Sequence, residues 1–266
     1  MKTGLTLQEI NNNNWPSDNS EGGGQMTVCV AAIAEGGEKI ILATDNMITV
    51  AIGGNIQYQR EDASHKKINK LTNGTYALFC GQLSFQESVL RLTLDKISPN
   101  ASPLEVANFT RVALREFYHQ LCQQEILMRF NLNWDIFVNK QQQLNQELVK
   151  ELVQKINAFT PDIHVIIAGH DDKSGDAFLG LAGGIGYLFE RTLEGFLTSG
   201  SGGELAKFSL ILHDYSPSLG AEKAEGLVRQ AIIDAKKSPG VGDLGDLVII
   251  SRPAKQSNPQ YPKRDL

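Results

Sequence analysis

The chain has 266 residues, of which 41% are hydrophobic and 21% are charged, and its formal net charge is −5. These values are typical of a globular protein with a full apolar core, long enough for one large domain or two small ones. With no basic block and no run of roughly 18 apolar residues, the sequence predicts neither a nucleic-acid partner nor a membrane span.

The remaining composition favours a cytoplasmic protein without a metal or cofactor. The N-terminus lacks the apolar core of a secretory signal. Three cysteines, Cys29, Cys80 and Cys122, show no paired or metal-type spacing and lie in apolar runs, as reduced buried thiols do. The five histidines show no ligand spacing either, so we expect no metal site and predict no cofactor.

Residues 1–25 are polar and contain four consecutive asparagines and a run of three glycines. We interpret them as a disordered leader. Alternatively, Met26 is the true translation start, because a glycine run before a methionine resembles a ribosome-binding sequence translated by mistake. Residues 26–252 are expected to form one domain, and 253–266, with three prolines, a flexible tail.

The domain opens with a predicted β-hairpin. Residues 27–34 and 40–44 are apolar runs that flank a glycine turn at 35–38, and the second run ends at Asp45. Alternation places Thr27, Cys29 and Ala31 on one face of the first strand. Because both faces carry apolar or small residues, we expect the hairpin to be buried between layers.

Further elements follow from turn signals and periodicity. Residues 53–64 are predicted to be a loop or short hairpin, and 67–71 and 76–80 to be strands joined by an Asn-Gly turn. Helices are predicted at 84–97, with Ser84 as its N-cap, and at 103–129, 134–159, 204–212 and 221–237. Strands are predicted at 164–169, 177–181, 187–190, 196–199 and 247–251. This order favours an α+β sandwich of antiparallel sheets with helices packed outside.

Several stretches, in order, resemble the proteasome β-subunit family of N-terminal nucleophile (Ntn) hydrolases. They are TVCV with IILATD, HKKINKL, ALFCG, residues 163–172, the GSG before a helix, and DLVII. The similarity covers most of residues 27–252 and is interrupted by a helical insertion at about 125–160. It implies a four-layer αββα sandwich of two antiparallel sheets.

The resemblance also implies site residues. Thr27 matches the nucleophile, whose own amine serves as base once the preceding residues are removed, and Lys67 and Asp45 match the lysine that assists it and the carboxylate that orients this lysine. Ser201 matches the serine that supports the amine, and the Gly81 N–H matches the oxyanion donor. On the substrate side the matching positions are Thr49, Ile48, Phe79 and Leu83.

The sequence departs from the family at some positions and leaves alternatives open. Ser238 stands where the family usually has an aspartate, with Asp243 nearby as a substitute; Val241 and Met47 replace a usual serine and arginine. Cys29 shares the predicted face of Thr27 and is a rival nucleophile. The glycine loop at 200–203 could instead bind phosphate, although no Lys-Ser or Lys-Thr follows it.

Two functions therefore stand as expectations. The first is a threonine-type peptidase or amidohydrolase that uses Thr27 and acts on peptide or protein substrates. The second is a catalytically inactive scaffold that forms rings or binds a partner. The resemblance implies a homo-oligomeric ring, and an ATPase partner stays open.

Overall fold

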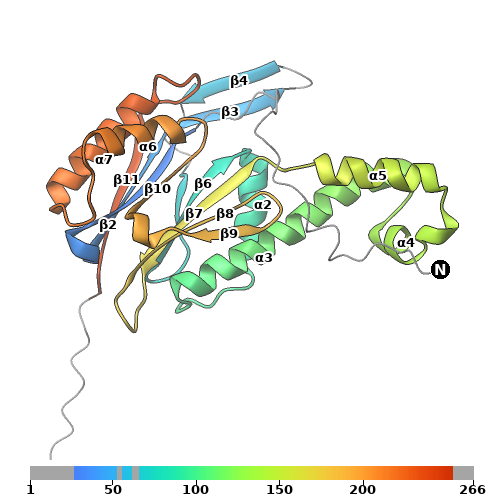
Figure 1. Ribbon diagram of the computed structural model, residues 1–266, viewed down its shortest axis with the longest axis horizontal. Coiled ribbons are helices and arrows are strands. Elements are labelled where there is room, and N and C mark those ends of the chain that lie inside the picture. The colour runs from blue at the N-terminus through green and yellow to red at the C-terminus, as the bar shows by residue number, and fades with distance from the viewer. Residues whose placement is uncertain (1–26, 53–55, 62–65, 254–266) are drawn as a thin grey trace, which may run out of the picture.

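The computed structural model describes residues 27–52, 56–61 and 66–253, with the backbone alone for 48–52 and 56–61. Within them the fold is α+β, with two antiparallel sheets and helices packed on them (Figure 1). The predicted leader at 1–25, the predicted start at Met26 and all but the first residue of the predicted tail lie outside the described residues.

The first sheet has four strands in the order β10-β1-β2-β11. They are β10 (Phe196–Ser199), β1 (Cys29–Ala34), β2 (Lys39–Asp45) and β11 (Leu244–Ser251). The predicted hairpin of β1 and β2 is confirmed: Cys29 pairs with Thr44 and Ala34 with Lys39. The turn between them is a 3₁₀ turn, Glu35–Gly37, in which both glycines have positive φ.

The second sheet has five strands in sequential order. They are β5 (Ile68–Lys70), β6 (Thr75–Gly81), β7 (Ile163–His170), β8 (Ala177–Gly183) and β9 (Tyr187–Glu190). A separate two-stranded ribbon joins β3 (Met47–Ile52) to β4 (Ile56–Glu61), so the prediction of a loop or short hairpin at 53–64 missed the strand that precedes it.

Buried side chains form separate clusters on the two faces of β1. Val28, Val30 and Ala32 pack against α6 (Gly203–Leu212) and α7 (Ala221–Ala235). Cys29, Ala31 and Ile33 belong to a cluster with side chains of both sheets, among them Leu78 and Ile166. Every residue of β1 is buried, as its two apolar faces predicted.

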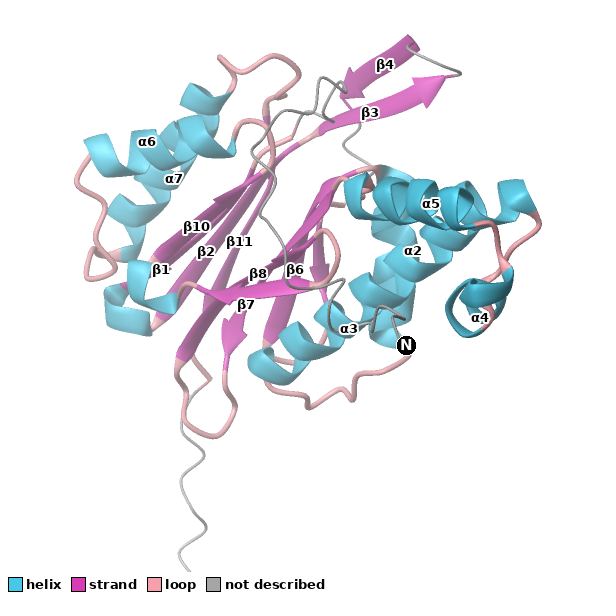
Figure 2. Ribbon diagram, turned by 45° about the vertical axis from the view of Figure 1, so that its right-hand side comes forward, coloured by secondary structure: helices cyan, strands magenta, loops and turns pink. Residues whose placement is uncertain are grey.

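The outer face of the five-stranded sheet packs against two other helices, α2 (Leu83–Leu94) and α3 (Pro103–Cys122). Figure 2 shows α6 and α7 beside one sheet and α2 and α3 beside the other. Ser102 caps α3 through a capping box with Glu105. The prediction that Ser84 caps α2 is wrong, because the helix begins one residue earlier and Gln82 holds the N-cap position. None of the helices in the described ranges combines the length and apolar character needed to cross a bilayer.

The predicted insertion forms a helical arm with its own apolar cluster, which includes Phe137, Leu152 and Ile156 (Figure 1). The predicted continuous helix at 134–159 is wrong. Helix α4 (Trp134–Asn139) ends, a 3₁₀ turn follows, and α5 (Gln146–Ala158) begins at a new N-cap, Asn145. The glutamine-rich stretch is the break, because Asn145 accepts hydrogen bonds from two amides of α5 and so starts a second helix.

The two sheets are joined by polar contacts at the Gly37 end of the hairpin. His170, at the end of β7, is buried, and its Nε2 lies 2.9 Å from the Gly37 carbonyl oxygen. Arg252 pairs with Glu38 at 2.7 Å and donates to the Ser174 carbonyl. Burial lowers the pKa of His170, partly offset by its hydrogen bond to Gly37.

This lowered pKa predicts a pH-dependent stability. Below about pH 6.5 the unfolded chain binds a proton at His170 before the folded chain does, so the free energy of unfolding falls as pH decreases toward the folded pKa. Urea unfolding at pH 7.5 and at pH 5 measures this loss. In His170→Gln the loss is expected to be smaller. His119, whose pKa burial also lowers, is present in both proteins and gives both the same loss. The extra loss in the parent protein is therefore the contribution of His170, and an equal loss in both proteins contradicts it.

Candidate functional site

Thr27 lies two residues before the start of β1 and is held at both ends of its backbone. Its nitrogen donates to Ser201 Oγ at 3.2 Å, and its carbonyl oxygen accepts from the Gly202 N–H at 3.2 Å. Gly200 has a φ of +90°, and a Cβ there would lie 2.2 Å from the Thr27 carbonyl oxygen. The loop therefore requires glycine at this position in order to enclose Thr27.

Asp45, at the end of β2, is buried and accepts hydrogen bonds on both carboxylate oxygens. Oδ1 accepts from Thr27 Oγ1 at 2.6 Å, from the Val28 N–H at 3.0 Å and from Lys67 Nζ at 2.6 Å. Oδ2 accepts from the N–H groups of Met47 and Gly242, at 3.2 Å and 3.0 Å. These five donors compensate the cost of keeping a carboxylate away from water.

Lys67 reaches the same point from the other sheet. It directly precedes β5, and its carbonyl oxygen accepts from the Phe79 N–H of β6 at 3.1 Å. Its Nζ lies 2.5 Å from Thr27 Oγ1 and 2.6 Å from Asp45 Oδ1, and the side chain is 5% exposed. The threonine hydroxyl thus donates to a carboxylate and accepts from an ammonium group, which uses its donor and one acceptor site.

Gly81 is the last residue of β6 and lies two residues after Phe79, which contacts Cys29. Cys29, two residues after Thr27, donates its thiol to the Phe79 carbonyl at 3.5 Å, so β6 approaches β1 just before Gly81. Gly81 has a φ of +106°, and a Cβ there would lie 2.1 Å from the Asp162 carbonyl oxygen. The close packing of Gly81 against the backbone of Asp162 therefore requires glycine here, whether or not a substrate also approaches.

The structure brings together Thr27, Asp45, Lys67 and Ser201 from four separate segments. Phe79, expected beside the substrate, is 1% exposed and packs in the cluster under α2 and α3, so its position does not support that role. The side chains of Ile48 and Thr49 lie outside what the structure describes.

The surroundings of Cys29 and of the glycine loop at 200–203 bear on two alternatives that the sequence left open, a cysteine nucleophile and a phosphate site. Burial raises the pKa of the Cys29 thiol well above its ordinary value, and contact with Cys80 adds to this rise, so Cys29 has the character of a packing residue rather than a nucleophile. In the glycine loop, the Gly202 N–H is bonded to Thr27 and the Gly203 N–H to Gly200. These amides are therefore not available to a phosphate.

Ser238, Val241 and Asp243 differ from the pattern of the family that the sequence resembles, and they lie near Ser201 and Asp45. Ser238 Oγ donates to the Ser201 carbonyl at 3.3 Å, and Val241 is buried against α7. The Asp243 carboxylate is paired with Lys236, while its carbonyl oxygen accepts from the Asn46 N–H at 3.1 Å. Ser238 thus supports the loop that carries Ser201 instead of supplying a carboxylate.

Sequence reasoning missed two backbone donors at this site. Gly242 binds Asp45 Oδ2, and Gly202 binds the Thr27 carbonyl. Both contacts use main-chain N–H groups, which no residue type reveals. The glycines at 240 and 242 were the available signal, because they mark close approach of the backbone.

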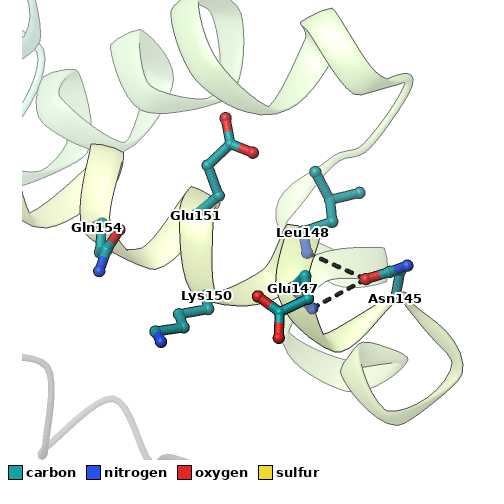
Figure 3. Close-up of a pocket in the computed structure, with 6 residues that line it drawn as sticks. All are labelled: Asn145, Glu147, Leu148, Lys150, Glu151 and Gln154. Carbon is teal, nitrogen blue, oxygen red and sulfur yellow. Dashed lines mark hydrogen bonds between the residues drawn. The ribbon is translucent and has the colours of Figure 1, made fainter.

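A separate hollow of about 520 Å³ lies along the helical arm (Figure 3). Its lining comes from one helix and its cap: Asn145, Glu147, Leu148, Lys150, Glu151 and Gln154. The dashed contacts in the figure are the capping bonds from Asn145 to α5. None of the Thr27 cluster lines it, and the side chains drawn do not converge on one point.

In the described ranges, no group of three or more His, Cys, Asp or Glu side chains is arranged to hold a metal ion. Comparison of the chain with models of protein families and with curated proteins found no match.

The buried ion pair predicts a large and specific loss of stability on mutation. Lys67→Met removes the ammonium group and leaves the Asp45 carboxylate buried with its charge unpaired, which is expected to cost about 3–5 kcal/mol. Lys66→Met is the matched control, because Lys66 is the exposed neighbouring residue and its loss is expected to cost less than about 0.5 kcal/mol. Chemical denaturation measures both. Equal stability of the two variants contradicts the ion pair.

Proposed function

We propose that this chain is a threonine-type peptidase or amidohydrolase, in which Thr27 becomes the N-terminal residue and its hydroxyl is the nucleophile. The observation that carries the proposal is the position of Thr27 Oγ1, 2.5 Å from Lys67 Nζ and 2.6 Å from Asp45 Oδ1. Ser201 Oγ lies 3.2 Å from the nitrogen that would become the free amine. The hydroxyl and the α-amine of Thr27 then lie in the same buried network of hydrogen bonds.

The reaction begins when Thr27 Oγ1 attacks the carbonyl carbon of a substrate amide. The hydroxyl proton passes to the Thr27 amine, directly or through a water molecule, while the Lys67 charge stabilises the developing negative charge. The Gly81 N–H is the proposed donor to the oxyanion. The C–N bond breaks as the amine gives its proton to the leaving nitrogen, which leaves an ester on Thr27.

Water completes the cycle. The amine accepts a proton from water, the resulting hydroxide equivalent attacks the ester carbon, and the C–O bond to Thr27 breaks as Oγ1 regains its proton. No cofactor is required for these steps. The peptide N–H of Thr27 in a longer chain has no free electron pair to accept a proton, so residues up to 26 have to be absent from the active form.

The same proposal assigns the chain to the proteasome β-subunit-like Ntn hydrolases, with a four-layer αββα sandwich in one domain at 26–252. The ordered motifs support this, as do the three apolar clusters, which link α6 and α7 to one sheet, the two sheets to each other, and α2 and α3 to the second sheet. The insertion at about 125–160 is the part outside the family pattern.

An inactive scaffold is the second candidate. Ser238 in place of the usual aspartate favours it, because a hydroxyl at the Ser201 carbonyl does not supply a negative charge near the amine. The scaffold keeps the same fold and dispenses with a free Thr27 amine. The two candidates therefore differ in whether Thr27 is ever the first residue.

Activity is tested with a chain produced from Met26, so that removal of the initiator methionine exposes Thr27. This protein is expected to hydrolyse peptide amides, and Thr27→Ala to lower kcat/KM by at least about 10³-fold because the nucleophile is lost. Thr27→Ser, which keeps a hydroxyl, is expected to retain part of the activity. Mass spectrometry verifies the first residue of each protein. Equal hydrolysis by the Thr27→Ala protein rejects the peptidase and favours the scaffold.

The outer helix α6 supports the proposed homo-oligomer. Four apolar side chains at helical spacing are exposed on it: Leu205, Phe208, Ile211 and Leu212, the last at 78%. Ala206 and Leu210 on the opposite side are buried in the core, so α6 is apolar around most of its circumference. Such a helix is typical of an element covered by another protein surface.

The exposed apolar side chains of α6 give a test of assembly. Phe208→Glu introduces a charge among them and is expected to reduce the assembly to smaller species. Lys207→Glu, on the adjacent exposed position, is expected to keep the parent mass. Size-exclusion chromatography with light scattering reports the masses. A parent chain that is monomeric at tens of micromolar, or an unchanged mass in Phe208→Glu, contradicts this interface.

A further inference from the structure

Gln86 is a buried amide on the apolar face of α2. The buried residues of this helix are Gln86, Val89 and Thr93, at helical spacing, and Val89 belongs to the apolar cluster under α2 and α3. Burying an amide without a partner costs free energy, so such a position ordinarily favours an apolar side chain. Here the Gln86 Nε2 donates to the Gly81 carbonyl oxygen at 2.8 Å. The contact with Gly81 therefore accounts for a polar residue at this place.

The Gln86 contact completes the anchoring of the peptide group that follows Gly81. The carbonyl of this group accepts from Gln86, and its N–H, which belongs to Gln82, donates to the Asp162 carbonyl at 3.1 Å. The backbone N–H of Gln86 donates to the Gln82 carbonyl at 3.0 Å, so the side chain that reaches Gly81 starts from the same turn. Both polar atoms of the peptide group are therefore held, one of them by a side chain of α2.

Gly81 lies at the end of β6 that is nearer to Thr27. At the other end, the residue before β6 accepts from the His170 N–H at 3.2 Å, and the His170 ring contacts the turn of the β1–β2 hairpin. Toward Gly81, the Phe79 carbonyl accepts from the thiol of Cys29, which is two residues after Thr27. Strand β6 therefore runs from the hairpin turn toward Thr27 and ends there with Gly81.

The strand pattern also gives the direction of the Gly81 N–H. The Phe79 N–H donates to the Lys67 carbonyl at 3.1 Å, and N–H groups two residues apart on a strand point to the same side. The Gly81 N–H is therefore directed to the side of β6 on which Lys67 lies. Because the Lys67 Nζ is 2.5 Å from Thr27 Oγ1, this is the side of the proposed nucleophile.

We propose, on the premise of the peptidase function, that Gln86 is a positioning residue that keeps the Gly81 N–H directed at the oxyanion. Glycine lacks a Cβ and adopts more backbone conformations than other residues, so the direction of its N–H has to be fixed by its surroundings. The oxyanion forms only as the substrate carbonyl is attacked. A displaced N–H therefore lowers kcat, whereas binding of the substrate in its ground state is unchanged.

The experiment uses the Thr27-initiated chain and a peptidyl aminocoumarin as substrate. Gln86→Met keeps the length of the side chain and removes the N–H donor. It is expected to lower kcat at least about tenfold and to leave KM within about twofold of the parent value. A peptide aldehyde forms an adduct with the Thr27 hydroxyl whose oxygen takes the oxyanion position, and it is expected to bind more weakly by the factor lost in kcat/KM. Urea unfolding gives the folded fraction to which each kcat is normalised.

A second variant, Gln86→Glu, adds a readout in pH. The carboxylate has no proton to donate to the Gly81 carbonyl, whereas the protonated carboxyl group donates as the amide does. Burial raises the pKa of a carboxyl group, so the ratio of the kcat of Gln86→Glu to the parent kcat is expected to rise at least about threefold from about pH 8 to about pH 5.5. The same ratio for Gln86→Met, which cannot take up a proton, is expected to stay constant.

Thr93→Val is the matched control. Thr93 Oγ1 donates to the Val89 carbonyl at 2.8 Å, so this variant also removes a buried hydrogen bond from side chain to backbone in α2, away from Gly81. It is expected to keep the parent kcat and KM. An equal kcat in Gln86→Met and Thr93→Val, a change in KM alone, or a ratio for Gln86→Glu that does not vary with pH overturns the inference.

Comparison with the Thr27→Ala protein separates the two proposals. If the parent protein hydrolyses the aminocoumarin in a Thr27-dependent manner and Gln86→Met does so at the parent rate, only the role of Gln86 fails. If no substrate is hydrolysed in a Thr27-dependent manner, the peptidase function fails, and the role of Gln86 fails with it.

Discussion

The contact between Asp45 and Lys67 is the constraint on which the arrangement of the site depends. The carboxylate ends β2 of one sheet, and the ammonium group comes from the residue before β5 of the other, at 2.6 Å. Neither charge can be buried alone without a large loss of stability, so the pair fixes how the two sheets meet at this end. The hydroxyl of Thr27 is held between the two charges, and its position follows from theirs.

The glycine loop adds the second constraint, on the backbone of Thr27. Gly202 binds the Thr27 carbonyl, and Ser201 binds its nitrogen, while Gly200 leaves room for the approach. A side chain at Gly200 would push the loop away and separate Ser201 from the nitrogen. Thr27 is therefore fixed at its hydroxyl by side chains and at its backbone by a loop.

The sequence predicted those features that periodicity and turn chemistry control. The hairpin of β1 and β2 and the two faces of β1 follow from alternation, and the loop at Gly200 follows from its glycines. The positions at which helices begin could not be predicted: Asn145 starts a new helix inside an apolar repeat of four, and α2 begins at Leu83 although Gln82 makes no side-chain capping bond. The burial of Phe79 under the helices follows from its face of the strand, because adjacent residues of β6 belong to different clusters.

The apolar cluster between the sheets separates the polar contacts at one end of them from those at the other. Cys29, Leu42 and Ile166 at its centre have no exposed surface, so water does not reach them. Polar contacts close the space at both ends, through His170 and Gly37 at one and through Asp45 and Lys67 at the other. At the second end the Thr27 hydroxyl is hydrogen-bonded to both charges, beside the exposed Ser201. Thr27, Asp45 and Lys67 are themselves almost fully buried, so the exposed Ser201 is the member of this group that faces solvent, and the ion pair is kept away from water by the same packing that forms the core.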